Sequence, residues 1–317
     1  MKKILLVILI VAVALVVLSV SKDQMLKNTI TSVGSQLTGA RISKTGFSWR
    51  ILRQSVKISG FKMQNPKGFS NAVLIDLPKA AVGYDLFSLF KGKTHLKFVD
   101  IQLNELLLEK NKDGQLNVDV LKISQSKDAK AKDKKPAKAG ELQIDELNLM
   151  IGKVIYKDYS RGEPPIIQVH DINLTRSYKN ITSSEQLAAL ILAAPLQAAG
   201  IKGAGIYGAA ALTGIALLPV AAGTTIFGKD HVQEDINAPI DLVYTLSLGI
   251  LKKSGKVNKE DMANGIIDAE VSGASVALKL KQISSRVTQV TISARKALLP
   301  KPEIAGGILY QIKEKIK

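Results

Sequence analysis

The chain of 317 residues contains no cysteine, only three histidines, and few aromatic residues, which make up 5% of it. The absence of cysteine excludes disulfides, zinc–thiolate centres, thiol nucleophiles and cysteine-linked lipid anchors. His95, His170 and His231 lie far apart, so none has a partner at metal-ligand spacing. No GxSxG elbow is present, and the adjacent carboxylates Asp145 and Glu146 would point to opposite faces of a strand. We therefore expect no catalytic residue, no metal site and no cofactor, and the protein is not predicted to be an enzyme.

Acidic residues are also scarce: 27 Asp and Glu stand against 44 Lys and Arg, which gives a formal charge of +17. Such a balance favours an anionic partner, either nucleic acid or a phospholipid surface. The basic stretches lack the aromatic residues on which bases stack, so nucleic acid is not the expected partner. Gly203, Gly205 and Gly208 have the spacing of a dinucleotide fingerprint, but the preceding segment is predicted to be helical, which argues against one. Phospholipid head groups meet the same electrostatic requirement.

Charged residues are absent from Ile4 to Val20, a run long enough to cross a bilayer as a helix. Lys2 and Lys3 precede the run and would hold the amino end in the cytoplasm. No small-residue cleavage site follows, which favours an uncleaved signal anchor over residues 1–21 rather than a cleaved signal peptide. The anchor residues are Ile4, Leu5, Leu6, Ile8, Leu9, Ile10, Leu15 and Leu18. Everything after Ser21 would then be translocated.

Residues 22–183 are dominated by segments in which apolar and polar residues alternate, which is typical of half-buried strands. Turn signals such as NPKG (65–68) and KNKDG (110–114) separate them, and residues 84–93 suggest a short helical connector. The expected strands are 56–63, 71–85, 94–110, 115–121, 141–158 and 164–178. A lysine-rich stretch at 122–140 has no apolar periodicity. It is predicted to be a solvated loop, with contact to an anionic membrane or to nucleic acid as the alternatives.

Residues 184–228 are rich in glycine and alanine and nearly free of charge. Ser184 is a candidate N-cap for a helix that runs to Pro195, and a second apolar run follows at 203–227. The glycines allow close helix approach, so we expect an apolar helical hairpin that dips into the membrane or packs under the sheet. A single membrane crossing and a wholly soluble core remain alternatives.

The last part, residues 229–317, is predicted to form a small α+β domain with the order αβββα. An amphipathic helix is expected at 239–255, capped by Gly255, and a final helix starts at Pro302. The three strands between them are expected at 265–271, 275–283 and 287–295, with a hairpin turn around SGAS (272–275).

Several motifs in the first 180 residues together resemble the AsmA family of bacterial envelope proteins. They are an N-terminal membrane helix, VKISGFKMQNPKGF (56–69), the connector DLFSLFKG (85–92), LEKNKDGQLN (108–117) and LQIDELNLMIGKVIYKDYS (142–160). The resemblance implies a protein anchored in the bacterial inner membrane with its bulk in the periplasm. Relatives include bridge-like lipid transfer proteins, whose curved β-sheets form a groove with an apolar floor. The family is linked to outer-membrane assembly and phospholipid homeostasis.

This chain has too few strands to cross a periplasm, so the resemblance does not imply a complete lipid bridge. From about Asp235 the chain is similar to a small bacterial envelope domain of unknown function, which implies an extracytoplasmic location but no activity. The predicted fold class is thus α+β: a transmembrane helix, a curved antiparallel AsmA-like sheet, an apolar helical hairpin and the αβββα module.

We predict an inner-membrane anchored protein of envelope biogenesis whose apolar sheet face binds phospholipid or helps to move it. The residues expected to line this face are Val56, Ile58, Val99, Ile101, Leu103, Leu147, Leu149, Ile172 and Leu174. Strand alternation alone leaves another interpretation open, in which these residues are covered by a helix or a second sheet. The alternative function is a structural or assembly factor that binds another envelope protein through the C-terminal domain.

Overall fold

The computed structural model describes residues 42–43, 46–50, 53–91, 93–120, 142–201 and 230–316. Its contacts divide the chain into two compact units, each described by itself below. The first unit comprises residues 1–108, 115–154 and 172–222, and the second comprises 109–114, 155–171 and 223–317. The second unit thus combines the C-terminal module with a piece of the β-domain. The expected anchor at 1–21, the lysine-rich loop at 122–140 and the apolar run at 203–227 lie outside the described residues.

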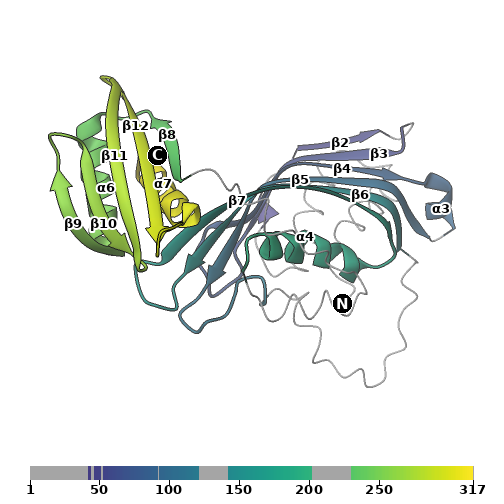
Figure 1. Cartoon of the computed structure of the whole chain (residues 1–317). Helices are drawn as coiled ribbons and strands as arrows, with labels where there is room; N and C mark the ends of the chain where they lie inside the picture. Colours follow the sequence, from purple (N-terminus) through teal and green to yellow (C-terminus); the bar gives the residue numbers. More distant parts are fainter. Residues whose placement is uncertain are drawn as a thin grey trace. The chain divides into compact units, whose positions relative to one another are not determined.

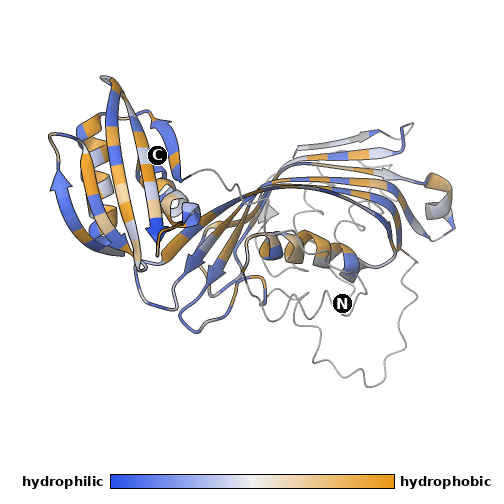
Figure 2. Ribbon diagram, in the orientation of Figure 1, coloured by the Kyte–Doolittle hydropathy of each residue, from blue (hydrophilic) through white to orange (hydrophobic). Residues whose placement is uncertain are grey.

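A seven-stranded curved sheet dominates the first part of the chain (Figure 1). Its strands are β1 (Ile42–Ser43), β2 (Gly46–Arg50), β3 (Ser55–Gln64), β4 (Val73–Tyr84), β5 (Thr94–Lys110), β6 (Leu142–Asp158) and β7 (Ile166–Ile181). The order is β1-β3-β4-β5-β6-β7, and β2 also pairs with β3. Apolar and polar residues alternate along much of β3, β5 and β6 (Figure 2), which confirms the strands expected at 56–63, 94–110 and 141–158.

The sheet is mixed rather than purely antiparallel, which corrects one part of the expected fold class. Asn148 Nδ2 donates to Asp100 Oδ1 at 3.0 Å, and five residues further along both strands Lys153 Nζ lies 3.3 Å from Glu105 Oε2. Because residue numbers increase in the same direction along both strands, β5 and β6 run parallel. Parallel neighbours need a long crossover connection, and residues 111–141 provide it. The strand expected at 115–121 is wrong: the chain makes a turn at residues 117–120 instead.

Among the described residues, two helices accompany this sheet: α3 (Leu86–Phe90), the expected connector, and α4 (Ser184–Ala198). The N-cap of α4 is Ser183 rather than Ser184, because the Ser183 hydroxyl accepts the Gln186 N–H at 3.1 Å. The helix also continues beyond Pro195 to Ala198. Within the described residues, no helix is both long and apolar enough to span a membrane.

The C-terminal module contains two helices and six strands. The helices are α6 (Ile240–Ser254) and α7 (Pro302–Ile316); the strands are β8 (His231–Ile236), β9 (Gly255–Asp261), β10 (Ile266–Val271), β11 (Ala274–Ser284), β12 (Val287–Lys296) and β13 (Leu299–Pro300). The order is β9-β10-β11-β12, with β8 and β13 both paired to the free side of β12. The expected αβββα order therefore lacked β8, β9 and β13. These edge strands are mostly polar or very short, so alternation gave no signal for them.

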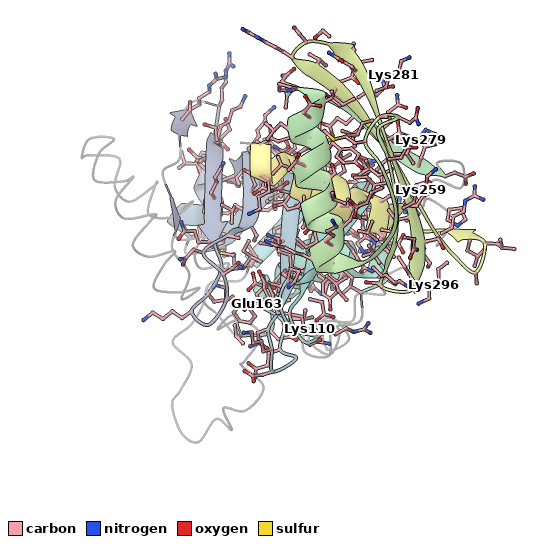
Figure 3. All side chains as sticks on the ribbon, turned by 90° about the vertical axis from the view of Figure 1, so that its left-hand side faces the viewer. Lys110, Glu163, Lys259, Lys279, Lys281 and Lys296 are labelled. Atoms are coloured by element: carbon pink, nitrogen blue, oxygen red, sulfur yellow. The ribbon has the colours of Figure 1, made fainter. Side chains whose placement is uncertain are left out.

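Both helices of this module pack on one face of its sheet and close a core of their own. Leu278 and Ile292 at its centre are fully buried, as are Leu251 of α6 and Ile312 of α7. The other face of the sheet is polar and exposed, and Figure 3 shows Lys259, Lys279 and Lys281 on the side away from α6. The SGAS hairpin is confirmed, since β10 and β11 pair directly across it.

Helix α7 also contacts the beginning of β7, which belongs to the same unit. Gly306 and Gly307 allow this approach: a Cβ added to Gly307 would lie 1.8 Å from the carbonyl oxygen of Ile167. Beside it, the Lys157 ammonium of β6 lies 5.4 Å from the ring centre of Tyr310, in a cation–π contact. The glycine pair therefore joins the C-terminal helix to the β6–β7 hairpin.

Candidate functional site

The nine residues predicted to line an apolar face come from four strands, β3, β5, β6 and β7. Seven of them are buried, namely Val56, Val99, Ile101, Leu103, Leu147, Leu149 and Leu174. Ile58 of β3 and Ile172 of β7, on the outer strands, are only half-buried. The face is therefore most enclosed on the two central strands.

Strand register places these side chains in rows across the sheet. Val56 pairs with Val82, and Val82 pairs with Val99. In the next row Ile58 pairs with Ala80, and Ala80 pairs with Ile101. Because directly opposed residues point to the same face, Val82 and Ala80 of β4 belong to the site although sequence reasoning missed them. Their segment, AAVGY, is apolar without alternation, so its two faces could not be told apart.

The opposite face of the same strands is polar. Ser59, Lys79 and Gln102 form one cross-strand row and are all exposed. A sheet with one apolar and one polar face must cover the apolar side with other apolar groups. The two central strands of this sheet are long, with 17 residues in β5 and 17 in β6.

Helix α4 supplies part of that cover. It lies on the concave side of the sheet (Figure 1), and Leu187, Leu190 and Leu196 are fully buried. Its 15 residues span about 22 Å at 1.5 Å per residue. A 17-residue strand spans about 56 Å at 3.3 Å per residue. Thus α4 reaches along less than half the length of β5.

The motifs that carry the family resemblance have a structural role at one end of the sheet. Asn117 of the GQLN segment is fully buried, and its Nδ2 donates to Asn65 Oδ1 of NPKGF at 2.8 Å and to the Leu107 carbonyl at 2.9 Å. Asn65 in turn donates to Ser70 Oγ at 3.3 Å. These amides hold the β3–β4 loop against the turn after β5.

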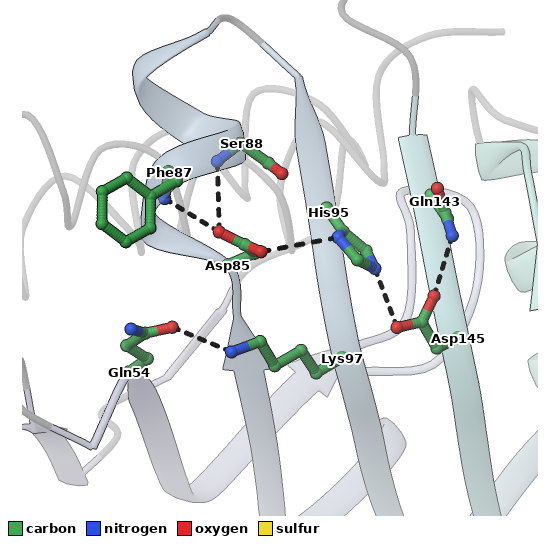
Figure 4. Close-up of polar contacts among 8 residues, drawn as sticks. All are labelled: Gln54, Asp85, Phe87, Ser88, His95, Lys97, Gln143 and Asp145. Carbon is green, nitrogen blue, oxygen red and sulfur yellow. Dashed lines mark hydrogen bonds and ion pairs between the residues drawn. The ribbon is translucent and has the colours of Figure 1, made fainter.

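A second polar cluster lies at the other end of the sheet, around α3 (Figure 4). His95 Nε2 lies 2.8 Å from Asp145 Oδ2, and His95 Nδ1 lies 3.9 Å from Asp85 Oδ2. Asp85 caps α3 by accepting hydrogen bonds from the backbone N–H groups of Ser88 and Phe87. These two bonds lower the pKa of the Asp85 carboxyl, and the bond from Ser88 has the larger effect. The cluster fixes α3 to β5 and β6.

Within the described residues, no three histidine, aspartate or glutamate side chains are grouped so that they could hold a metal ion. Burial, more than the neighbouring Asp158, raises the pKa of Tyr156 to about 12, so this phenol stays protonated near neutral pH. A crevice in the second unit, between α7 and the start of β7, has a volume of about 50 Å³. That volume is far below what even part of a phospholipid would require.

The sequence matches the model of the AsmA family over residues 2–225, which is most of the chain. The chain therefore belongs to the AsmA family, and membership indicates an envelope-associated protein. A search of curated proteins finds no match.

Proposed function

We propose that this protein is anchored in the bacterial inner membrane, faces the periplasm, and binds phospholipid acyl chains along the apolar face of its seven-stranded sheet. It assists envelope biogenesis by holding or moving lipid and carries out no catalytic step. Residues 1–21 form the anchor in this proposal. The family assignment supports the envelope setting.

One observation carries the proposal: the sheet has an apolar face that extends from β3 to β7, and its central strands are longer than α4, the described helix that lies against them. α4 accounts for about 22 Å of a strand length of about 56 Å. Ile58 of β3 and Ile172 of β7 are half-buried, so apolar surface continues to the outer strands. Acyl chains are apolar, flexible and abundant beside an anchored protein, and burying them against this face is favourable by about 25 cal/mol per Å².

The test is to count bound phospholipid on the intact protein by native mass spectrometry after release from nanodiscs. Ile58→Asp places a charge on the apolar face, whereas Ser59→Asp places the same charge on the exposed opposite face of the same strand. We expect wild type and Ser59→Asp to retain phospholipid and Ile58→Asp to lose most of it. Circular dichroism checks that all three proteins are folded.

A protein that is consistently free of lipid under these conditions would contradict the proposal. Equal retention by the two aspartate variants would show that lipid is held elsewhere, for example around the anchor.

A specific observation also favours the alternative, an assembly factor that binds another envelope protein through the C-terminal domain. The β12–β13 turn exposes two leucines, Leu298 at 88% and Leu299 at 66%, beside Lys296. A photo-crosslinking amino acid at Leu298 in living cells should then give one discrete protein adduct, and the same amino acid at exposed Leu242 should give none.

A further inference from the structure

We propose that the end of the sheet that carries α3 is a membrane-contact surface for anionic phospholipid bilayers. This surface, called the basic end here, consists of Arg50, Arg53, Phe87, Lys91, Lys93 and Lys97. The inference goes beyond the proposed function, because it names the surface that meets the bilayer and holds even if the apolar face carries no lipid.

The residues of the basic end come from three segments that the fold brings together. Arg50 ends β2 opposite Ser55, and the turn that contains Arg53 lies beside the end of β4, because Tyr84 N–H donates to the Gln54 carbonyl at 2.9 Å. Lys97 Nζ donates to Gln54 Oε1 at 3.1 Å, which places the start of β5 at the same end (Figure 4).

Charge at this end favours an anionic partner. All five cationic side chains are exposed. Among the described residues at this end, the carboxylates are Asp85, which caps α3 and interacts with Lys97, and Asp145, which bonds His95 and Gln143. A lysine or arginine near an anionic bilayer contributes about a fivefold gain in binding.

The exposed ring of Phe87 favours a bilayer, rather than an anionic solute, as the partner of this surface. Its side chain is 74% exposed although it is large and apolar, and Figure 4 shows it pointing away from the Asp85–His95–Asp145 contacts. The capped α3 holds it in place, since Asp85 accepts the Phe87 N–H at 2.8 Å. An exposed aromatic ring among cations is typical of side chains that enter the head-group region, where the ring is buried and the cations meet phosphates.

The position of the basic end fits this partner. The Val56–Val82–Val99 row of the apolar face begins one residue from Ser55, at this same end of the sheet. A bilayer seated on the basic end would therefore lie next to the first row of the apolar face.

The test uses the full chain in proteoliposomes and the absence of native cysteine. Phe87→Cys is labelled with an environment-sensitive fluorophore, and Met150→Cys gives the matched control. Met150 is also an exposed apolar residue of the first unit, but it lies about 16 Å along β6 from Asp145. Vesicles contain phosphatidylcholine alone or with 30% phosphatidylglycerol, plus a lipid with a quencher in its acyl chain.

We expect strong quenching at position 87 in the anionic vesicles, at least threefold weaker quenching in phosphatidylcholine alone, and little at position 150 in either. Adding Arg53→Glu and Lys91→Glu to the labelled Phe87→Cys chain should remove most of the quenching while circular dichroism stays unchanged. Absent quenching at position 87, equal quenching at both positions, or insensitivity to the two charge reversals would each overturn the proposal.

Discussion

The two sheets of this protein differ in how far helices cover their apolar faces. Each has one apolar and one polar face. In the C-terminal module, two amphipathic helices of 15 residues each cover a sheet whose main strands have 6 to 11 residues, and the core closes on itself. In the seven-stranded sheet, the one described helix of 15 residues, α4, lies against strands of up to 17 residues.

Helix length explains why the difference matters. A helix rises 1.5 Å per residue and a strand about 3.3 Å, so a helix needs twice as many residues to cover the same distance. In the C-terminal module each helix spans about 22 Å and the longest strand about 36 Å, whereas α4 spans about 22 Å and β5 about 56 Å. The long sheet therefore suits a partner that is apolar along its length, which in our account is lipid.

The largest expected effect is on the free energy of unfolding, and it compares the cores of the two units. Leu278 of β11 and Leu149 of β6 are both fully buried, so replacing either by alanine removes the same groups. Leu278→Ala should lower the free energy of unfolding of its unit by about 2–5 kcal/mol, whether or not lipid is present. Phospholipid should raise the stability of the first unit, in wild type and in Leu149→Ala, and leave that of the C-terminal module unchanged, because a ligand bound to the native state stabilises it. Hydrogen exchange of the full chain measures the stability of each unit with and without lipid. An equal response of the two units to lipid would contradict this prediction.

A second change tests how α7 is joined to the β6–β7 hairpin. Gly307→Ala places a Cβ against the Ile167 carbonyl, a backbone group that cannot easily move, so we expect destabilisation of about 3 kcal/mol. Gly249→Ala in α6 is the control, since its added Cβ meets no atom within 4 Å. It should stabilise by about 0.5–1 kcal/mol through helix propensity. Loss of stability in both would show that alanine is harmful for some other reason.

The pH dependence of the second unit should report on His170. Burial lowers the pKa of this side chain, although Glu303 and Asp171 act in the opposite direction. Between the lowered pKa and about 6.5, the unfolded chain binds the proton and the folded chain does not, so stability falls as the pH is lowered through this window. His170→Gln should flatten the dependence between pH 7.5 and pH 5.5 in hydrogen exchange. An unchanged slope would assign the effect to other groups.

The smallest expected effect is a gain. Ala297 and Leu298 in the β12–β13 turn have φ angles of 47° and 68°, a region that L-residues with side chains adopt at a cost. Replacing the pair with Asn-Gly, the preferred sequence for such a turn, should stabilise the module by about 1 kcal/mol. Little burial is lost, because Leu298 is 88% exposed. A thermal unfolding midpoint that falls instead would mean that the leucines contribute to the folded state.

Alternation predicted the strands well where one face is buried and the other is not. The expected segment 94–110 has the same bounds as β5, and Val99, Ile101 and Leu103 share a face as expected. The pattern could not give the direction of the neighbouring strand, because side-chain periodicity is the same in parallel and antiparallel pairs. It also failed for β8 and β9, which are edge strands with few apolar residues.

The contacts that fix the two ends of the long sheet were beyond sequence reasoning for a different reason. His95 and Asp145 are 50 residues apart, and Asn65 and Asn117 are 52 apart. Only the register of the folded sheet brings such pairs together. The motifs that contain the two asparagines were recognised as a family signature, but the sequence could not show that one bonds to the other.

Site-specific photo-crosslinking of the full chain in living cells tests the central claim most directly. A photoreactive phenylalanine derivative is placed at Ile58 on the apolar face or at Ser59 on the opposite face, and phospholipids are labelled with radioactive phosphate. Our account predicts labelled protein from position 58 and none from position 59. Labelling at neither position, or at both alike, would contradict it.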